Sequence, residues 1–288
     1  MKIVRSPAEL EPAQRAVAIG TFDGVHRGHR AAIETAVATG LRSAVVTFTP
    51  HPRTVLGYDV QLISSLERRI ELIDAIGPDD LIVLEFTQEL AGREPEEFVA
   101  EVLEPLGTRV VIAAESFRFG KGRRGDIALL RECGLEVKKV PLVEGVSSTR
   151  IRELLREGDV SAAARLLGRP AEVEGPVVGG DQRGGTLGFP TANLAPDPAL
   201  LVPAHGIYAG GALNHRAAIS IGVNPHYGGH ERRVEAFLLD FHGDLYGQTL
   251  RIELWKRLRD ERAFASEEEL IRQIALDVEA TREAERPA

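Results

Sequence analysis

The alternation of apolar runs with helical segments over the first half of the chain constrains its fold more than any other feature. Runs typical of buried strands occupy residues 16–19, 43–48, 80–86, 109–113 and 135–140. Segments with helical spacing lie between them, at 28–39, 64–76, 95–106 and 126–132. This order predicts a doubly wound α/β domain with a parallel sheet, in which ligands bind beyond the carboxyl ends of the strands.

The second part of the chain has a different pattern. Two short helices are expected at 149–156 and 160–167, after which Gly and Pro interrupt the helical spacing. Strand-like runs follow at 171–178, 206–213, 217–223, 233–241 and 249–258, which predicts a small antiparallel β-barrel. We therefore expect two domains, residues 1–169 and 170–288. A last helix is expected from Ser266, in a capping box with Glu269, to cover an open side of the barrel.

Composition limits the class of protein. A length of 288 residues suits two cores, and a net charge of −8 argues against a general nucleic-acid binder. The single cysteine, Cys133, excludes an intramolecular disulfide and fits a reducing compartment. Neither an apolar signal segment nor a membrane-length apolar run occurs, so we expect a cytoplasmic protein. The sequence does not reveal its oligomeric state.

The decapeptide GTFDGVHRGH, residues 20–29, joins the first predicted strand to the first predicted helix. An anion at the start of that helix meets free backbone N–H groups and the positive end of the helix dipole. His26 and His29 lie three residues apart and therefore point to one side of the first turn. Two imidazoles there suit the stabilisation of charge on a phosphate. Histidines without a function, or half of a metal site, are the alternatives.

The decapeptide resembles the signature of the nucleotidyltransferase superfamily, which includes the FAD synthetase half of bacterial bifunctional riboflavin kinase/FMN adenylyltransferases. TFTPHP (47–52), ESFRFG (115–120) and SSTRIR (147–152) resemble further segments of that family, in the same order. The resemblance implies that His26 and His29 stabilise the α-phosphate of ATP and Arg150 the leaving pyrophosphate. The other implied nucleotide contacts are Gly20, Phe22, Asp23, Gly28, Ser147, Ser148 and Thr149. The implied flavin contacts are His51, Pro52, Ser116, Phe117 and Phe119, although the two phenylalanines are equally consistent with a core position.

A second signature lies downstream. GGDQRGGTLGFPTAN (179–193) resembles the riboflavin kinase motif of the same enzymes. Glycines let backbone N–H groups approach phosphates, and oxygen side chains two residues apart suit Mg²⁺. The resemblance implies that Thr191 and Asn193 hold Mg²⁺ with ATP. It also implies nucleotide contacts at Gly179, Arg183 and Gly188, and a flavin contact at Asn224.

Glu235 stands among apolar residues of a predicted strand, where a carboxylate is costly unless it has a partner or a function. By resemblance, Glu235 is the general base that takes the proton from the ribityl 5′-hydroxyl of riboflavin as that oxygen attacks the γ-phosphate of ATP. The alternative is an outward-facing edge residue, since strand alternation puts Val234 and Ala236 on the other face.

The chain departs from the family pattern at several positions. Ala114 and Ser116 replace the glycine and asparagine before the FxFG turn, while Gly185 and His226 replace an arginine and a threonine in the second half. We expect conversion of riboflavin to FMN and of FMN to FAD, with ATP and Mg²⁺ in both steps. The alternatives are a riboflavin kinase with weakened adenylyl transfer and a flavin-binding regulator without turnover.

Overall fold

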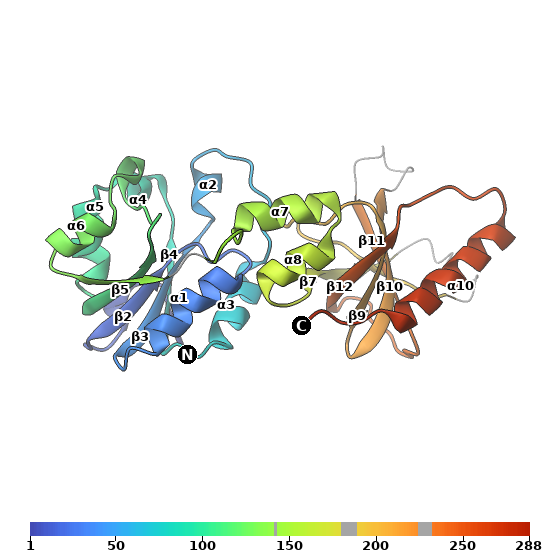
Figure 1. Cartoon of the computed structure of the whole chain (residues 1–288), viewed down its shortest axis with the longest axis horizontal. Coiled ribbons are helices and arrows are strands. Elements are labelled where there is room, and N and C mark those ends of the chain that lie inside the picture. Colours follow the sequence, from blue (N-terminus) through green and yellow to red (C-terminus); the bar gives the residue numbers. More distant parts are fainter. Residues whose placement is uncertain (141–142, 180–188, 224–231) are drawn as a thin grey trace. The chain divides into compact units, whose positions relative to one another are not determined.

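The computed structural model describes residues 1–140, 143–179, 189–223 and 232–288. These residues form two compact units, Met1–Val146 and Ser147–Ala288, each with its own sheet (Figure 1). The domain boundary near residue 170 stays a prediction.

The first unit is built on a six-stranded parallel sheet, as the sequence predicts. Its order is β1-β4-β3-β2-β5-β6, with β2 and β5 at the centre of the reversal in strand order. The strands are β1 (Lys2–Val4), β2 (Arg15–Ile19), β3 (Arg42–Thr49), β4 (Asp80–Glu85), β5 (Thr108–Ala114) and β6 (Glu136–Val140). Strand β1 was not expected, because three residues are too few to show a periodicity.

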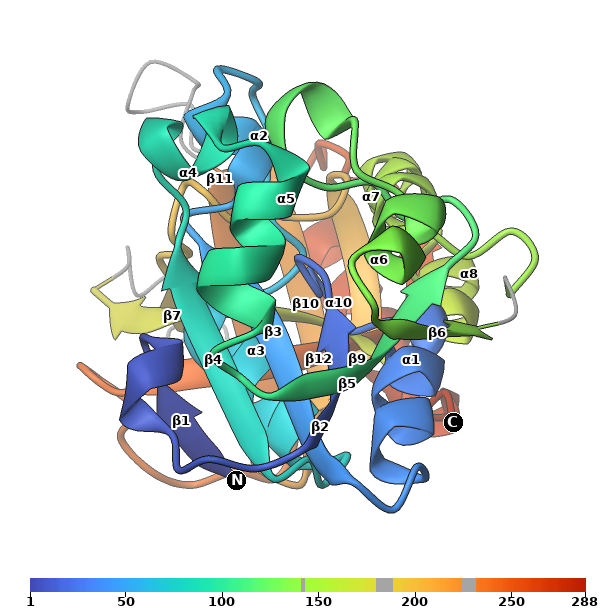
Figure 2. The same cartoon turned by 90° about the vertical axis from the view of Figure 1, so that its left-hand side faces the viewer.

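Helices cover both faces of this sheet (Figure 2). One core packs side chains of α5 (Pro95–Phe98), the π-helix η2 (Val99–Leu103) and α6 (Ile127–Glu132) against the strands. The other packs α1 (Arg27–Val37) and α3 (Leu66–Asp74) against the opposite face. The segment expected as one helix over 95–106 is thus two elements. The short elements that sequence periodicity missed are η1 (Pro7–Glu9), α2 (Pro52–Val55), α4 (Gln88–Gly92) and η3 (Lys121–Arg123).

A buried ion cluster lies at the amino ends of the central strands. The carboxylate of Asp80 is fully buried and accepts hydrogen bonds from Arg15 Nε at 2.9 Å and from Arg42 Nε and Nη2 at 2.7 and 2.8 Å. Asp79 accepts from the backbone N–H and the hydroxyl of Ser43 at 2.7 and 2.8 Å. The cluster ties β2, β3 and β4 together at the edge of the sheet opposite their carboxyl ends.

The second unit contains α7 (Ser148–Glu157), α8 (Val160–Leu167), an antiparallel barrel and the C-terminal helix α10 (Glu267–Glu283). The barrel is closed, with the order β10-β11-β8-β7-β12-β9. Its strands are β7 (Ala171–Val178), β8 (Ala192–Leu194), β9 (Gly206–Ala212), β10 (His215–Val223), β11 (Arg232–Leu238) and β12 (Thr249–Arg259).

The expectation that the barrel has an open side is wrong. The three-residue strand β8, too short to be seen in the sequence, pairs with both β7 and β11 and completes the ring. Helix α10 packs instead against β9 and β10. The hydroxyl of Ser266 caps this helix by accepting from Glu269 N–H at 3.2 Å, but the Glu269 carboxylate accepts from Ala265 N–H rather than closing a capping box with Ser266.

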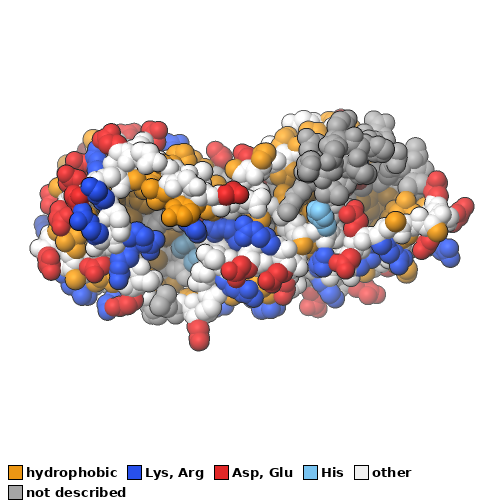
Figure 3. Space-filling view, turned by 90° about the horizontal axis from the view of Figure 1, so that it is seen from above, with side chains coloured by type: hydrophobic (Ala, Val, Ile, Leu, Met, Phe, Trp, Pro, Cys, Tyr) orange, Lys and Arg blue, Asp and Glu red, His pale blue; other side chains and the backbone are white. Residues whose placement is uncertain are grey.

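Charged groups are distributed over the surface. Figure 3 shows Lys and Arg side chains interspersed with Asp and Glu on the face seen there. Among the described residues, no helix has the length and apolar character needed to cross a membrane.

Candidate active sites

The chain leaves the central strand β2 through a tight loop. Phe22, Gly24 and Val25 have φ angles of 49°, 77° and 36°, in the left-handed region. A Cβ atom at Gly24 would lie 2.7 Å from Ile63 Cγ2, so a glycine is required there. This loop delivers the amino end of α1 to the carboxyl edge of the sheet, at the reversal in strand order where doubly wound folds bind ligands.

The two histidines of the decapeptide form one unit at the start of α1. His26 is the N-cap residue, and its Nδ1 accepts a hydrogen bond from His29 N–H at 3.2 Å. The two rings stack with centroids 3.6 Å apart, and Phe22 meets the His29 ring edge-on. A Cβ atom at Gly28 would lie only 3.3 Å from His26 Cε1, so glycine leaves room for this ring. The expectation that both imidazoles lie on one side of the turn is confirmed.

Burial and neighbouring charge keep His29 neutral. Desolvation lowers the pKa of His29 well below its ordinary value, and the charges of His26 and Arg69 lower it further. The Nδ1 atom of His29 is buried and has no hydrogen-bond partner among the described residues. A neutral imidazole with an unpaired nitrogen is suited to exchange a hydrogen bond with an incoming ligand.

Asp23 organises the loop that faces the histidines. Its side chain is fully buried, and Oδ1 accepts from the backbone N–H groups of Ile63 and Ser64 at 2.9 and 3.2 Å. The Ser64 hydroxyl in turn accepts from Gly24 N–H at 3.1 Å. These contacts correspond to an orienting function for Asp23, and contact with a ribose stays a prediction.

Arg69 on α3 is a buried cation that sequence reasoning missed. Only 2% of the residue is exposed, and its Nη1 donates to the carbonyl oxygen of Phe48 at 3.1 Å. Its Nε is buried without a partner among the described residues. Desolvation lowers the pKa of Arg69, and the negative charge of Asp23 opposes this change. Its spacing from Ile73 on the apolar stripe of the helix was a signal available in the sequence.

The residues expected to contact flavin in the first unit have different surroundings. His51 caps α2, with Nδ1 accepting from Arg53 N–H at 3.1 Å, and Pro52 is the first residue of that helix. Ser116 is exposed after β5. Phe119 is buried in the core against Phe98, and half-buried Phe117 stacks on it. Flavin contacts at all five positions stay predictions.

The SSTRIR segment begins α7 in the second unit, so its proximity to His26 and His29 stays a prediction. The Ser147 hydroxyl caps the helix by accepting from Arg150 N–H at 3.1 Å, and Ser148 and Thr149 follow in the first turn. Arg150 is exposed and donates to Glu153 Oε2 at 3.1 Å. Arg152, by contrast, is buried. Of the two arginines in the segment, the exposed one is thus Arg150, for which contact with pyrophosphate stays a prediction.

Polar side chains of three neighbouring barrel strands surround Glu235. Glu235 on β11 is paired with Asn193 on β8 and with Ser220 on β10. Its Oε2 accepts from the hydroxyl of Thr191 at 3.3 Å, and its Oε1 forms an ion pair with Arg233. Strand β11 lies between β10 and β8, so the reading of Glu235 as an edge residue is wrong.

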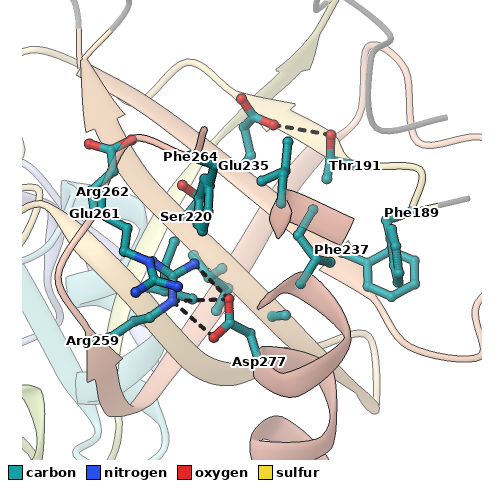
Figure 4. A pocket seen from close by; sticks show the side chains of 15 residues that line it. Phe189, Thr191, Ser220, Glu235, Phe237, Arg259, Glu261, Arg262, Phe264 and Asp277 are labelled. Carbon is teal, nitrogen blue, oxygen red and sulfur yellow. Dashed lines mark hydrogen bonds and ion pairs between the residues drawn. The ribbon is translucent and has the colours of Figure 1, made fainter. Parts of the chain in front are cut away.

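Two cavities share Thr191, the residue that donates to this carboxylate. The larger, about 340 Å³, contains Glu235 and Thr191 at one rim, with aromatic and apolar walls (Figure 4). Its walls include Phe189, Ile207, Ile219, Phe237, Phe264, Leu270 and Ile274. The smaller cavity, about 210 Å³, is lined by Pro190, Asp244 and Tyr246 among others. Thr191 lines both cavities. Thr191 and Glu235 were predicted as site residues individually, whereas the aromatic walls formed by Phe189, Phe237 and Phe264 were not.

The remaining site predictions fall in the glycine-rich loop and its neighbour. Gly179 is exposed just after β7. Arg183, Gly188 and Asn224 lie outside the described residues, as do the departures Gly185 and His226. Their functions stay predictions.

The two units together define an enzyme class. A doubly wound domain with a histidine pair at a helix start is followed by a barrel with a carboxylate at the rim of a cavity, and the two parts match two families of phosphorus-group transferases. Residues 8–152 match the FAD synthetase family model and residues 167–285 the riboflavin kinase family model.

Full-length relatives identify the family. The chain is 36% identical to the bifunctional riboflavin kinase/FMN adenylyltransferase of Bacillus subtilis, covering 93% of this chain and 91% of that one. Identity to the Escherichia coli protein of the same name is 33%, over 98% of this chain and 97% of the other. The chain belongs to the bifunctional riboflavin kinase/FMN adenylyltransferase family.

A solved structure has the same fold over nearly the whole chain. It is described as a macrolide-efflux protein from Streptococcus pneumoniae and superposes with a TM-score of 0.90 at 30% identity, covering 98% of this chain and 99% of that one. The efflux activity in that description belongs to the other protein and has no counterpart in the two family matches of this chain.

Proposed function

We propose that the barrel transfers the γ-phosphate of ATP to riboflavin and that the first domain transfers the adenylyl group of a second ATP to the resulting FMN. Family membership supports both activities. The observation that carries the kinase assignment is the position of Thr191, which lines both cavities and donates to Glu235. In this proposal the γ-phosphate is transferred beside Thr191, from ATP in one cavity to riboflavin in the other.

The lining of the two cavities supports a different occupant for each. The larger cavity has aromatic walls, which suit the flat isoalloxazine ring of a flavin. Its rim carries Glu235, where the ribityl chain would end. The smaller cavity is lined by Val178 at the end of β7 and by Pro190, the residues on either side of the glycine-rich segment of the sequence, which suits a nucleotide. The flavin hydroxyl and the γ-phosphate then approach each other beside Thr191.

Glu235 acts as the general base in this arrangement. It takes the proton from the ribityl 5′-hydroxyl, the new O–P bond forms at the γ-phosphorus, and the bond to the β,γ-bridging oxygen breaks so that ADP leaves. The hydroxyl of Thr191 holds one carboxylate oxygen, and Arg233 is ion-paired with the other. No covalent intermediate on the protein is required.

The donor set beside Glu235 fits Mg²⁺. Thr191 Oγ1 and Asn193 Oδ1 are oxygen ligands, the type that Mg²⁺ prefers, and both lie next to a carboxylate. When bound with ATP, the ion would neutralise charge on the phosphates. Thr191 and Asn193 would hold it, and the place of Thr191 in the lining of both cavities would position the nucleotide relative to Glu235.

The first domain supplies a separate phosphate site. An oxygen of the FMN phosphate attacks the α-phosphorus of ATP, and the bond to the α,β-bridging oxygen breaks, releasing pyrophosphate. The amino end of α1 presents backbone N–H groups, and His26 and His29 present imidazoles to the developing charge. The buried charge of Arg69 beside them attracts the same anion. Arg150 must release Glu153 before it can bind pyrophosphate.

One assay tests both steps. The protein is incubated with riboflavin, ATP and Mg²⁺, and FMN and FAD are separated by chromatography over time. We expect FMN first and FAD afterwards. FMN without FAD would mean that the Ala114 and Ser116 departures have weakened adenylyl transfer. Absence of both products would mean that the protein binds flavin without turnover.

A further inference from the structure

Arg233 bridges two residues of the proposed kinase site. It lies on β11 two positions before Glu235 and on the same face of the strand. Its guanidinium forms an ion pair with Glu235 Oε1, and its Nε donates to Asn193 Oδ1 at 3.2 Å. Because Asn193 and Glu235 face each other across β8 and β11, one side chain holds both in register.

This contact competes with a metal ion. Mg²⁺ binds oxygen at about 2.0–2.1 Å and carries two positive charges. The Asn193 oxygen, while it accepts a hydrogen bond from a guanidinium, faces a cation that repels Mg²⁺. Two arginines line the larger cavity itself: Arg259 is paired with Asp277, with Nη2 to Oδ2 at 2.7 Å, and Arg262 with Glu269 at 3.9 Å, and the hydrogen bond to Asn193 Oδ1 comes from Arg233. Arg233 is therefore the cation best placed to oppose metal binding at Asn193.

A purely structural function does not explain the pair. The Arg233 and Glu235 side chains are 29% and 25% exposed. Partly exposed pairs of this kind contribute about 0–1 kcal/mol to folding. Their value to the protein therefore lies in the site they occupy.

We infer that Arg233 is a positioning residue that holds Asn193 and Glu235 before the metal–nucleotide complex binds, and that it moves off Asn193 when the metal arrives, thereby setting the Mg²⁺ requirement of the kinase. The inference rests on the proposed function of the barrel. It assigns to this arginine an effect that weakens metal binding, whereas Thr191 and Asn193 strengthen it as ligands.

Metal binding without turnover tests the inference. Mn²⁺ is titrated into the protein with ADP, and free Mn²⁺ is counted by EPR for wild type, Arg233→Gln and Arg233→Lys. Glutamine removes the charge and is expected to tighten Mn²⁺ binding about tenfold. Lysine keeps the charge and is expected to stay within about twofold of wild type. Arg233→Ser is a second neutral variant should the glutamine protein not fold.

A matched control lies elsewhere on the barrel. Arg251→Gln removes a similar half-buried pair with Glu174, on β12 and β7, and is expected to leave Mn²⁺ affinity unchanged. Unchanged or weaker Mn²⁺ binding in both neutral Arg233 variants overturns the inference. Wild-type protein that binds Mn²⁺ and ADP but forms no FMN contradicts the proposed kinase instead, so the two failures are distinguishable.

Discussion

The backbone N–H of His29 donates to Nδ1 of His26, and the two imidazole rings stack with centroids 3.6 Å apart. Because Nδ1 of His26 accepts this bond, the proton of the neutral ring is carried on Nε2. The helix start therefore sets the tautomer of one histidine and the position of the other. A single local contact links the cap of α1 to the chemistry proposed for the first domain.

Replacement of His29 by Asn should separate the two activities. Loss of one preorganised donor to a phosphate lowers the rate by about 10²–10³. We expect FAD formation from supplied FMN to fall by this factor, while FMN formation from riboflavin stays at the wild-type rate. Both rates are measured by chromatography on one preparation, so the kinase serves as the internal control. An equal loss of both activities would contradict the division of labour between the domains.

His29 should also make stability depend on pH. The pKa of His29 lies below its unfolded value of about 6.5, so the unfolded chain binds a proton first as the pH falls. The stability contribution is thus present above about pH 6.5 and decreases below it. Urea unfolding at pH 7.5 and 5.5 should show a smaller decrease for His29→Asn than for wild type. An equal decrease in the free energy of unfolding of both proteins would show that His29 does not cause the pH dependence.

Arg69 should lower the stability of the fold and increase the rate of FAD formation. Methionine at this position removes a buried charge with an unpaired Nε, so the desolvation cost of that charge no longer opposes folding. A charge-assisted hydrogen bond to phosphate contributes about 1.5–3 kcal/mol, so FAD formation should fall by about 10- to 150-fold. Urea unfolding and the FAD assay measure the two effects.

The neighbouring arginine supplies the control for this experiment. Arg68 pairs with Glu71 at 2.8 Å on the same helix, and Arg68→Met should leave FAD formation unchanged. If Arg69→Met is destabilised yet makes FAD at the wild-type rate, Arg69 has a structural function only.

The longer strands and helices could be predicted from the sequence because the spacing of their apolar residues is periodic. The apolar run at 16–19 gives the buried strand β2, and the parallel sheet follows from alternating strands and helices. Strand β8 could not be predicted from the sequence, because three residues show no period and its pairing with β7 and β11 is long-range. The closed barrel therefore became visible only in three dimensions.

The candidate sites show the same limit. His26 and His29 were found because their spacing within one helix turn determines where they point. Arg69 acts through its depth beneath the end of β3, which depends on contacts with Phe48 far along the chain. Arg233 was passed over because the sequence shows an arginine near a glutamate but not the Asn193 side chain across the sheet. The walls of the larger cavity combine five separate elements in the same way.

Asp80 should be essential for stability. Asp80→Asn leaves Arg15 buried without its counter-charge, at a cost of about 3–5 kcal/mol. Burial raises the pKa of Asp80, but Arg42 and Arg15 outweigh it and hold the pKa below its ordinary value. This contribution is present above about pH 4 and lost as the pH falls further. Urea unfolding between pH 7 and 3 should show a steep loss for wild type and a flatter curve for the variant; equal slopes would contradict the assignment.

Glu235→Gln tests the proposed base of the kinase. The amide oxygen can still accept from Thr191, but the side chain no longer takes a proton, so FMN formation should fall by about 10²–10⁴. FAD formation from supplied FMN should remain, because the histidine site lies in the other domain. Glu174→Gln, which removes the acid of the comparable Arg251 pair, is the matched control and should keep full kinase activity. Wild-type FMN formation by Glu235→Gln would show that the ribityl hydroxyl loses its proton without this carboxylate, and would leave Thr191 and Asn193 as positioning groups only.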